Sequence, residues 1–121
     1  MGEWEILFHP EFEREIDRMS EEVQDRLFAH AGLLARIGPT LGRPHADTLT
    51  GSRHANMKEL RFDAAGGVWR VAFAFDPKRR AILLVGGDKS GSAQKRFYRR
   101  LIAMADERFD NHLAEMKGRD R

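Results

Sequence analysis

Three β-strand patterns separated by short turns occupy residues 57–87, and they constrain the fold more than any other feature. The outer patterns are Met57–Asp63 and Ala81–Gly87. The central pattern, Val68–Asp76, alternates between two faces: one carries Trp69, Val71, Phe73 and Phe75, and the other carries Arg70, Ala72 and Ala74. Connections as short as Gly66-Gly67 and Asp76-Pro77-Lys78 join antiparallel neighbours, so the sequence predicts an antiparallel meander.

Other elements are predicted on both sides of the meander. Residues 4–8 alternate like a short half-buried strand, and Pro10 suits the first position of a helix. Ser20 is a good N-cap for a second helix that Gly38-Pro39 ends, and a long helix is predicted to begin near Ser92 or Ala93. The expected order is β-α-α-β-β-β-α, an α+β fold in a single domain, 1–121, with the helices packed on one face of the sheet.

Composition excludes several classes of protein. The chain has no cysteine, which excludes disulfides, thiolate catalysis and cysteine zinc sites. No apolar run approaches the 18 or so residues needed to span a bilayer, and the first residues show neither a basic start nor an apolar signal core. We therefore expect a soluble cytoplasmic protein without a membrane partner.

Charge is distributed unevenly along a chain whose formal net charge is only +2. Residues 1–25 hold nine acidic side chains and two arginines, whereas residues 78–100 hold eight basic side chains and one aspartate. Such a basic segment suits an acidic partner, which would be nucleic acid, a membrane surface or an acidic protein. A solvated basic face without a partner is the alternative.

Arginines on the predicted sheet are the strongest candidates for a binding site. The chain has no Walker loop, zinc-protease, nucleophile-elbow or dinucleotide motif. Its five histidines are scattered along the sequence. We therefore expect neither a metal ion nor a cofactor. Alternation places Arg61 and Arg70 together on a face that the helices are expected to leave open. Two guanidinium groups on neighbouring strands can bind a phosphate in bidentate fashion.

Residues after the meander can extend this basic surface. Lys89 lies in the glycine- and serine-rich loop 86–92, and Lys95, Tyr98 and Arg99 lie on the first turns of the last helix. Each also has a plain structural interpretation: Tyr98 as an amphipathic core residue, and the lysines and arginine as solvated side chains.

Several of these segments resemble the RelE/HigB-type toxins of bacterial toxin–antitoxin systems. Leu49-Thr50-Gly51 followed by Met57–Phe62 resembles the family signature "L-x-G…lKELR", and Trp69–Asp76 is similar to the next family strand. Ile82–Gly91 and Gln94–Tyr98 match the third strand and the lysine-bearing loop of the HigB-like, phage-related branch.

The resemblance implies a RelE-like fold and the function of an mRNA interferase, in many relatives acting on the ribosome. In this metal-free reaction the 2′-hydroxyl of the RNA attacks the adjacent phosphate and leaves a cyclic phosphate. The protein must align the attack, stabilise charge and move two protons. The cognate antitoxin would be a helix-turn-helix protein.

Roles for individual residues follow from this expectation. Arg61 and Arg70 suit charge stabilisation, Lys89 suits phosphate neutralisation or proton transfer, Tyr98 suits base stacking or proton transfer, and His54 is the predicted neutral-pH proton carrier. Asp88 is either a base or an anchor for Lys89. The expected RNA-binding residues are Lys58, Lys95, Arg96 and Arg99.

Two other functions remain open from the sequence. ParE-type toxins share the fold but inhibit DNA gyrase by binding, and a non-catalytic nucleic-acid-binding module would also need a basic face. The chain departs from relatives that use a histidine near the C-terminal end of the site, since only His112 lies that late, and from those with several lysines on the first sheet strand.

Overall fold

A computed structural model describes residues 3–119 of the protein, and residues 1–2 and 120–121 of the predicted domain lie outside the described residues. In chain order the elements are β1 (Glu5–Phe8), α1 (Pro10–Ile16), α2 (Glu21–Ile37), a 3₁₀ turn η1 (Gly38–Thr40), β2 (Ala46–Thr48), β3 (Met57–Ala64), β4 (Gly67–Phe75), β5 (Arg80–Asp88) and α3 (Gln94–Arg119). The five strands form one sheet in the order β1-β5-β4-β3-β2. The α+β class and the antiparallel meander β3-β4-β5 are as predicted.

Local signals explain where the two N-terminal helices begin and end. His9 accepts a hydrogen bond from the Glu11 backbone N–H at the start of α1, which begins at Pro10. The Ser20 hydroxyl accepts one from the Val23 N–H, and this bond satisfies an otherwise unpaired donor of α2. Gly38 ends α2 with φ +77°, a conformation that residues with a side chain rarely adopt.

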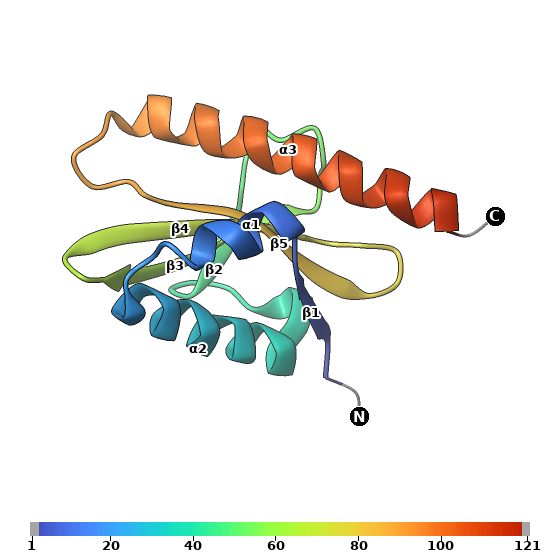
Figure 1. The fold of residues 1–121 in the computed structure, drawn as a ribbon, viewed down its shortest axis with the longest axis horizontal. Coiled ribbons are helices and arrows are strands. Elements are labelled where there is room, and N and C mark those ends of the chain that lie inside the picture. The colour runs from blue at the N-terminus through green and yellow to red at the C-terminus, as the bar shows by residue number, and fades with distance from the viewer. Residues whose placement is uncertain (1–2, 120–121) are drawn as a thin grey trace.

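Helices cover both faces of the sheet, so the prediction of helices on one face was wrong. Figure 1 shows α3 running along one face and α2 along the other. Val71 and Phe73 of β4 belong to the core beneath α1 and α2, whereas Ala72 and Ala74 belong to the core beneath α3. The alternation in β4 was predicted correctly, but the face with the small side chains is covered rather than open.

The α3 face suits a helix because its side chains are small. Ala72 and Ala74 are fully buried there, and they let α3 lie close to the sheet with Leu101, Ala105 and Phe109 inward. A β-bulge in β5 places Ala72 opposite Val85 but Phe73 opposite Leu83. As a result both Leu84 and Val85 reach the α3 core, which a regular strand would not allow. Neither α3 nor any other helix within residues 3–119 is apolar over a length that would span a bilayer.

The two edge strands differ from the meander. β1 pairs with β5 in parallel, with Glu5 opposite Arg80 and Phe8 opposite Leu83. β2 is only three residues long and pairs antiparallel with β3 as far as Leu60. The sequence predicts no strand between the second helix and the meander, and β2 was missed because three residues are too few to show an alternating pattern.

Candidate functional site

The cross-strand pair Arg61–Arg70 is the centre of the candidate site. β3 and β4 place the two residues directly opposite each other. Like charges in this position are unfavourable unless something compensates them. Their face is not open, since α3 covers it: the Arg70 side chain is only 7% exposed and that of Arg61 is 18% exposed.

Glu59 compensates the two arginines in part. It lies two residues before Arg61 on the same face of β3, and its Oε2 is 2.7 Å from Arg61 Nη1. Its Oε1 is 4.0 Å from Arg70 Nε. Oε1 is buried and accepts no hydrogen bond from any residue that the structure describes. A buried carboxylate oxygen without a donor is costly and calls for an explanation.

Tyr98, on α3, places its phenol ring next to the Arg61–Arg70 pair. Arg70 Nε donates a hydrogen bond of 3.3 Å to the Tyr98 hydroxyl. Burial raises the pKa of Tyr98, and the nearby Glu59 carboxylate raises it further, so the hydroxyl keeps its proton at neutral pH. We call Glu59, Arg61, Arg70 and Tyr98 the arginine cluster.

Lys89 reaches the arginine cluster from the loop after β5. Its ammonium lies 5.9 Å from the centre of the Tyr98 ring. Asp88 fixes this loop, because its carboxylate accepts hydrogen bonds from the backbone N–H groups of Val68 and Ser90. The bonds from Ser90 hold the pKa of Asp88 below its usual value. Of the two roles considered for Asp88, the structure therefore favours the anchor.

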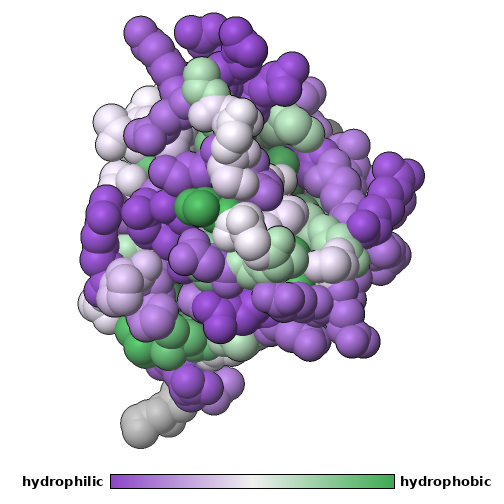
Figure 2. Space-filling view, turned by 90° about the vertical axis from the view of Figure 1, so that its left-hand side faces the viewer, coloured by the Kyte–Doolittle hydropathy of each residue, from purple (hydrophilic) through white to green (hydrophobic). Residues whose placement is uncertain are grey.

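Three of the four expected RNA-binding residues lie on the first turns of α3, which also carries Tyr98: Lys95, Arg96 and Arg99. Arg96 lines a hollow with Gly86 and Gly87 of β5. The face that the molecule presents at this end is largely hydrophilic (Figure 2). Lys58 is the exception. It alternates with Glu59 and shares the orientation of Leu60, so it lies on the α2 side of the sheet.

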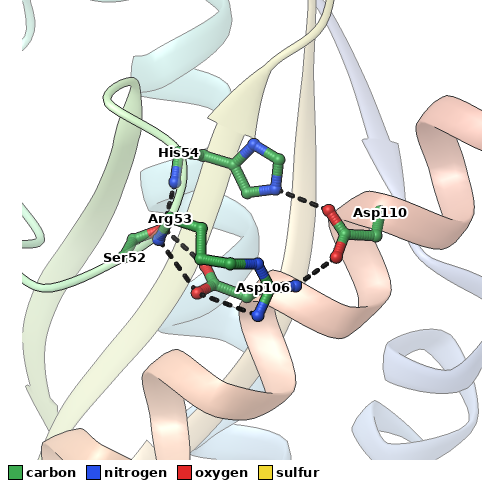
Figure 3. A network of polar contacts seen from close by, with 5 residues as sticks. All are labelled: Ser52, Arg53, His54, Asp106 and Asp110. Atoms are coloured by element: carbon green, nitrogen blue, oxygen red, sulfur yellow. Dashed lines mark hydrogen bonds and ion pairs between the residues drawn. The ribbon is translucent and has the colours of Figure 1, made fainter.

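His54 is not brought to the arginine cluster. Its Nε2 lies 2.8 Å from a carboxylate oxygen of Asp110, and its ring packs edge-on against Phe109. Asp110 follows Tyr98 by twelve residues on α3, which corresponds to about 18 Å along the helix. Figure 3 shows the network that holds His54, the histidine clamp: Ser52, Arg53, His54, Asp106 and Asp110.

Sequence reasoning missed Glu59 as a site residue. The signal was present, because Glu59 shares the alternation of Arg61 and stands opposite the small residue Ala72. An acidic side chain on a face otherwise destined for burial indicates either a structural ion pair or a functional group. No group of three or more His, Cys, Asp or Glu side chains within residues 3–119 is arranged to hold a metal ion.

Comparison with known proteins identifies the family. The model of the phage-derived Gp49-like family (DUF891) matches residues 14–110. The chain belongs to this family. It is 43% identical over 113 residues to "Putative toxin HigB3" of Mycobacterium tuberculosis, a match that covers 93% of this chain and 96% of the relative.

Two further comparisons agree with this assignment. HigB2 of the same organism, also named as a putative toxin, is 43% identical over 103 residues, which are 84% of this chain but about half (51%) of that longer protein. A mutant of the Escherichia coli toxin RelE in the free state superposes with a TM-score of 0.59 at 10% identity, covering 85% of this chain and 96% of the RelE chain. The protein thus groups with the HigB-named putative toxins and has the RelE fold, as predicted from its motifs.

Proposed function

We propose that this protein is the toxin of a type II toxin–antitoxin system and that it cleaves mRNA in the cytoplasm as a metal-independent endoribonuclease. The observation that carries the proposal is the buried Glu59 oxygen without a hydrogen-bond donor beside the opposed Arg61 and Arg70. Glu59 and the two arginines together carry one net positive charge. A phosphodiester bound there would balance that charge, and the adjoining ribose 2′-hydroxyl would be the donor that Glu59 Oε1 lacks.

In the proposed reaction each residue of the arginine cluster has a separate role. Arg61 and Arg70 bind the scissile phosphate and stabilise the charge that develops on its oxygens. Glu59 Oε1 accepts the proton of the attacking 2′-hydroxyl as the bond from the 2′-oxygen to phosphorus forms. Tyr98, which remains protonated at neutral pH, gives its proton to the departing 5′-oxygen. The products are a 2′,3′-cyclic phosphate and a free 5′-hydroxyl.

Residues around the cluster hold the RNA rather than transfer protons. Lys89 sits on a loop beside Tyr98 and neutralises a neighbouring phosphate. Lys95, Arg96 and Arg99 add positive charge along the first turns of α3, where they contact the sugar–phosphate backbone of the bound RNA. Lys58 and His54 have no part in this mechanism, because both lie away from the arginine cluster.

The direct test uses purified protein and end-labelled RNA, with and without ribosomes. We expect cuts at discrete sites in the presence of EDTA, products with cyclic phosphate ends, and no cutting of RNA that carries 2′-deoxyribose at the cut position. Activity that only a divalent ion restores would contradict the metal-independent mechanism.

Expression in cells separates the proposal from gyrase inhibition. Without its antitoxin, which we propose is a helix-turn-helix protein, the toxin should arrest growth and translation while mRNA is cut. Intact mRNA together with gyrase-dependent DNA breaks would overturn the RNase proposal in favour of a ParE-like function.

A further inference from the structure

A hollow of about 510 Å³ lies next to the arginine cluster, between α2 and the edge of β3. β2 pairs with β3 only as far as Leu60, and the Arg61 backbone N–H then donates to the carbonyl of His45. Beyond that bond no further strand of the described chain covers β3, and the hollow opens there. Arg61 and Arg70 line it together with side chains that the proposed reaction does not use.

Three aromatic rings lead from the core to this hollow. The buried ring of Phe62 lies 5.1 Å from that of His30 between ring centres, at 32° to it. The ring of His30 lies 5.4 Å from that of His45. Both histidines are half-buried. The row therefore ends in imidazole faces that a flat group entering the hollow can contact.

His30 is held in an uncharged form suited to stacking. Its Nδ1 donates a hydrogen bond of 2.9 Å to the Arg26 carbonyl oxygen, which fixes the ring plane and leaves Nε2 as the acceptor. Burial lowers the pKa of His30, and the neighbouring His45 lowers it further. At neutral pH the ring is thus a rigid, neutral surface with an acceptor nitrogen.

The cations around the hollow suit a nucleotide better than an apolar ligand. Arg26, Arg61 and Arg70 line it with a single acidic residue, Asp63. A hollow that combines aromatic faces with guanidinium groups fits a base attached to a phosphate, because single-stranded RNA is recognised by stacking on rings and by charge on its backbone.

We propose that this hollow is a nucleobase subsite, in which His30 and His45 stack on the base of a nucleotide adjacent to the phosphate held by Arg61 and Arg70. The inference rests on the proposed function and deepens it: the substrate is single-stranded RNA with an unpaired base turned toward α2. The subsite, rather than the arginine cluster, supplies sequence preference, since the arginines contact groups common to every nucleotide.

An abasic scan tests the subsite independently of catalysis. The probe is a fluorescent single-stranded 2′-O-methyl RNA, which cannot be cut, together with a set in which each nucleotide in turn lacks its base. Binding is measured by fluorescence anisotropy. For the wild type we expect about a tenfold loss of affinity when the base that enters the hollow is missing, the size of one base–ring stack.

The variant His45→Ala should bind the complete RNA about tenfold more weakly than the wild type does. Removal of the base that enters the hollow should not weaken its binding further. The variant His45→Phe should recover both the affinity for the complete RNA and the loss of affinity for the abasic RNA. Both variants keep the backbone bonds of His45. Asn111→Ala, an exposed change on the far part of α3, is the matched control and should behave like the wild type. An unchanged abasic penalty in His45→Ala would overturn the subsite.

Cleavage of unmodified RNA in parallel separates the two proposals. A wild type that leaves such RNA intact overturns the proposed function. A wild type that cuts RNA, with His45→Ala cutting the same sites at the same KM, overturns only the subsite.

Discussion

Two polar clusters lie along the same helix, and their hydrogen bonding differs. In the histidine clamp, both oxygens of Asp106 and both oxygens of Asp110 have partners, among them the Ser52 hydroxyl, the Arg53 guanidinium and backbone N–H, and the His54 ring. In the arginine cluster, Glu59 shares one oxygen with Arg61 and leaves the other without a donor among the described residues.

This difference separates a structural network from the one that we propose binds the substrate. The histidine clamp, in which every carboxylate oxygen has a partner, ties the loop 49–56 to α3. A buried acceptor without a donor beside two opposed cations costs stability in the free protein, and the proposed substrate would offset that cost. Residue types alone do not reveal the distinction, because both clusters combine arginine and carboxylate.

Arg70→Ala should produce the largest effect. Removal of the guanidinium takes away the proposed contact to the scissile phosphate, and we expect kcat for RNA cleavage to fall about 10³-fold. Single-turnover cleavage of labelled RNA measures it, with circular dichroism as the check on folding. A folded variant with nearly normal cleavage would mean that the arginine cluster is structural like the clamp.

Glu59→Gln should cost about 10²-fold in kcat, the contribution of a positioned general base, with KM unchanged or lower. The side chain keeps its size, but it loses its charge and one of its two acceptor oxygens becomes an amide donor. Single-turnover cleavage of labelled RNA at one fixed pH is the measurement. A folded variant that cleaves at nearly the wild-type rate would assign the base to another group.

Asp106→Ala should lower the stability of the protein without lowering its activity, which is the reverse of the effect expected for the arginine cluster. It leaves the Ser52 hydroxyl and the Arg53 N–H without their acceptor, and we expect the free energy of unfolding to fall by about 1–3 kcal/mol. Urea unfolding measures the change. The cleavage rate of the folded variant below its Tm should match the wild type, and a loss of rate at full folding would contradict a purely structural clamp.

Asp110→Asn should have the smallest effect, and one that depends on pH. The hydrogen bond from His54 holds the pKa of Asp110 below its ordinary value of 3.8. A depressed pKa in the folded state stabilises the protein above about pH 4, and this contribution is lost as the pH falls through the folded value. Stability curves of wild type and variant should therefore converge in acid. A difference that grows as the pH falls would contradict this origin.

Much of the fold could be predicted because local patterns carry it. The alternation in Val68–Asp76, the Ser20 cap and the stop at Gly38 each act over a few residues, and the structure confirms all three. The face on which α3 packs could not be predicted, since the stripe of Leu101, Ala105 and Phe109 shows that the helix is amphipathic but not which side of the sheet it meets.

The site was predicted in part for the same reason. Strand alternation placed Arg61 and Arg70 together, and the loop and helix that follow β5 brought Lys89 and Tyr98 to them. The path of the loop 49–56 has no such periodicity, so nothing in the sequence showed that His54 turns to Asp110. The proximity of His30 and His45 likewise depends on how α2 meets the β3 edge.

The parallel pairing of β1 with β5 also determines how much of the chain must be synthesised before the sheet can form. The first strand, which begins at Glu5, has no partner until the chain has been extended past Arg80, and Tyr98 joins the arginines only when α3 docks. Contacts between segments so distant in sequence form late in folding. The arginine cluster is therefore complete only after the chain has been synthesised through the first turns of α3, so the proposed cleavage of mRNA cannot begin before that point.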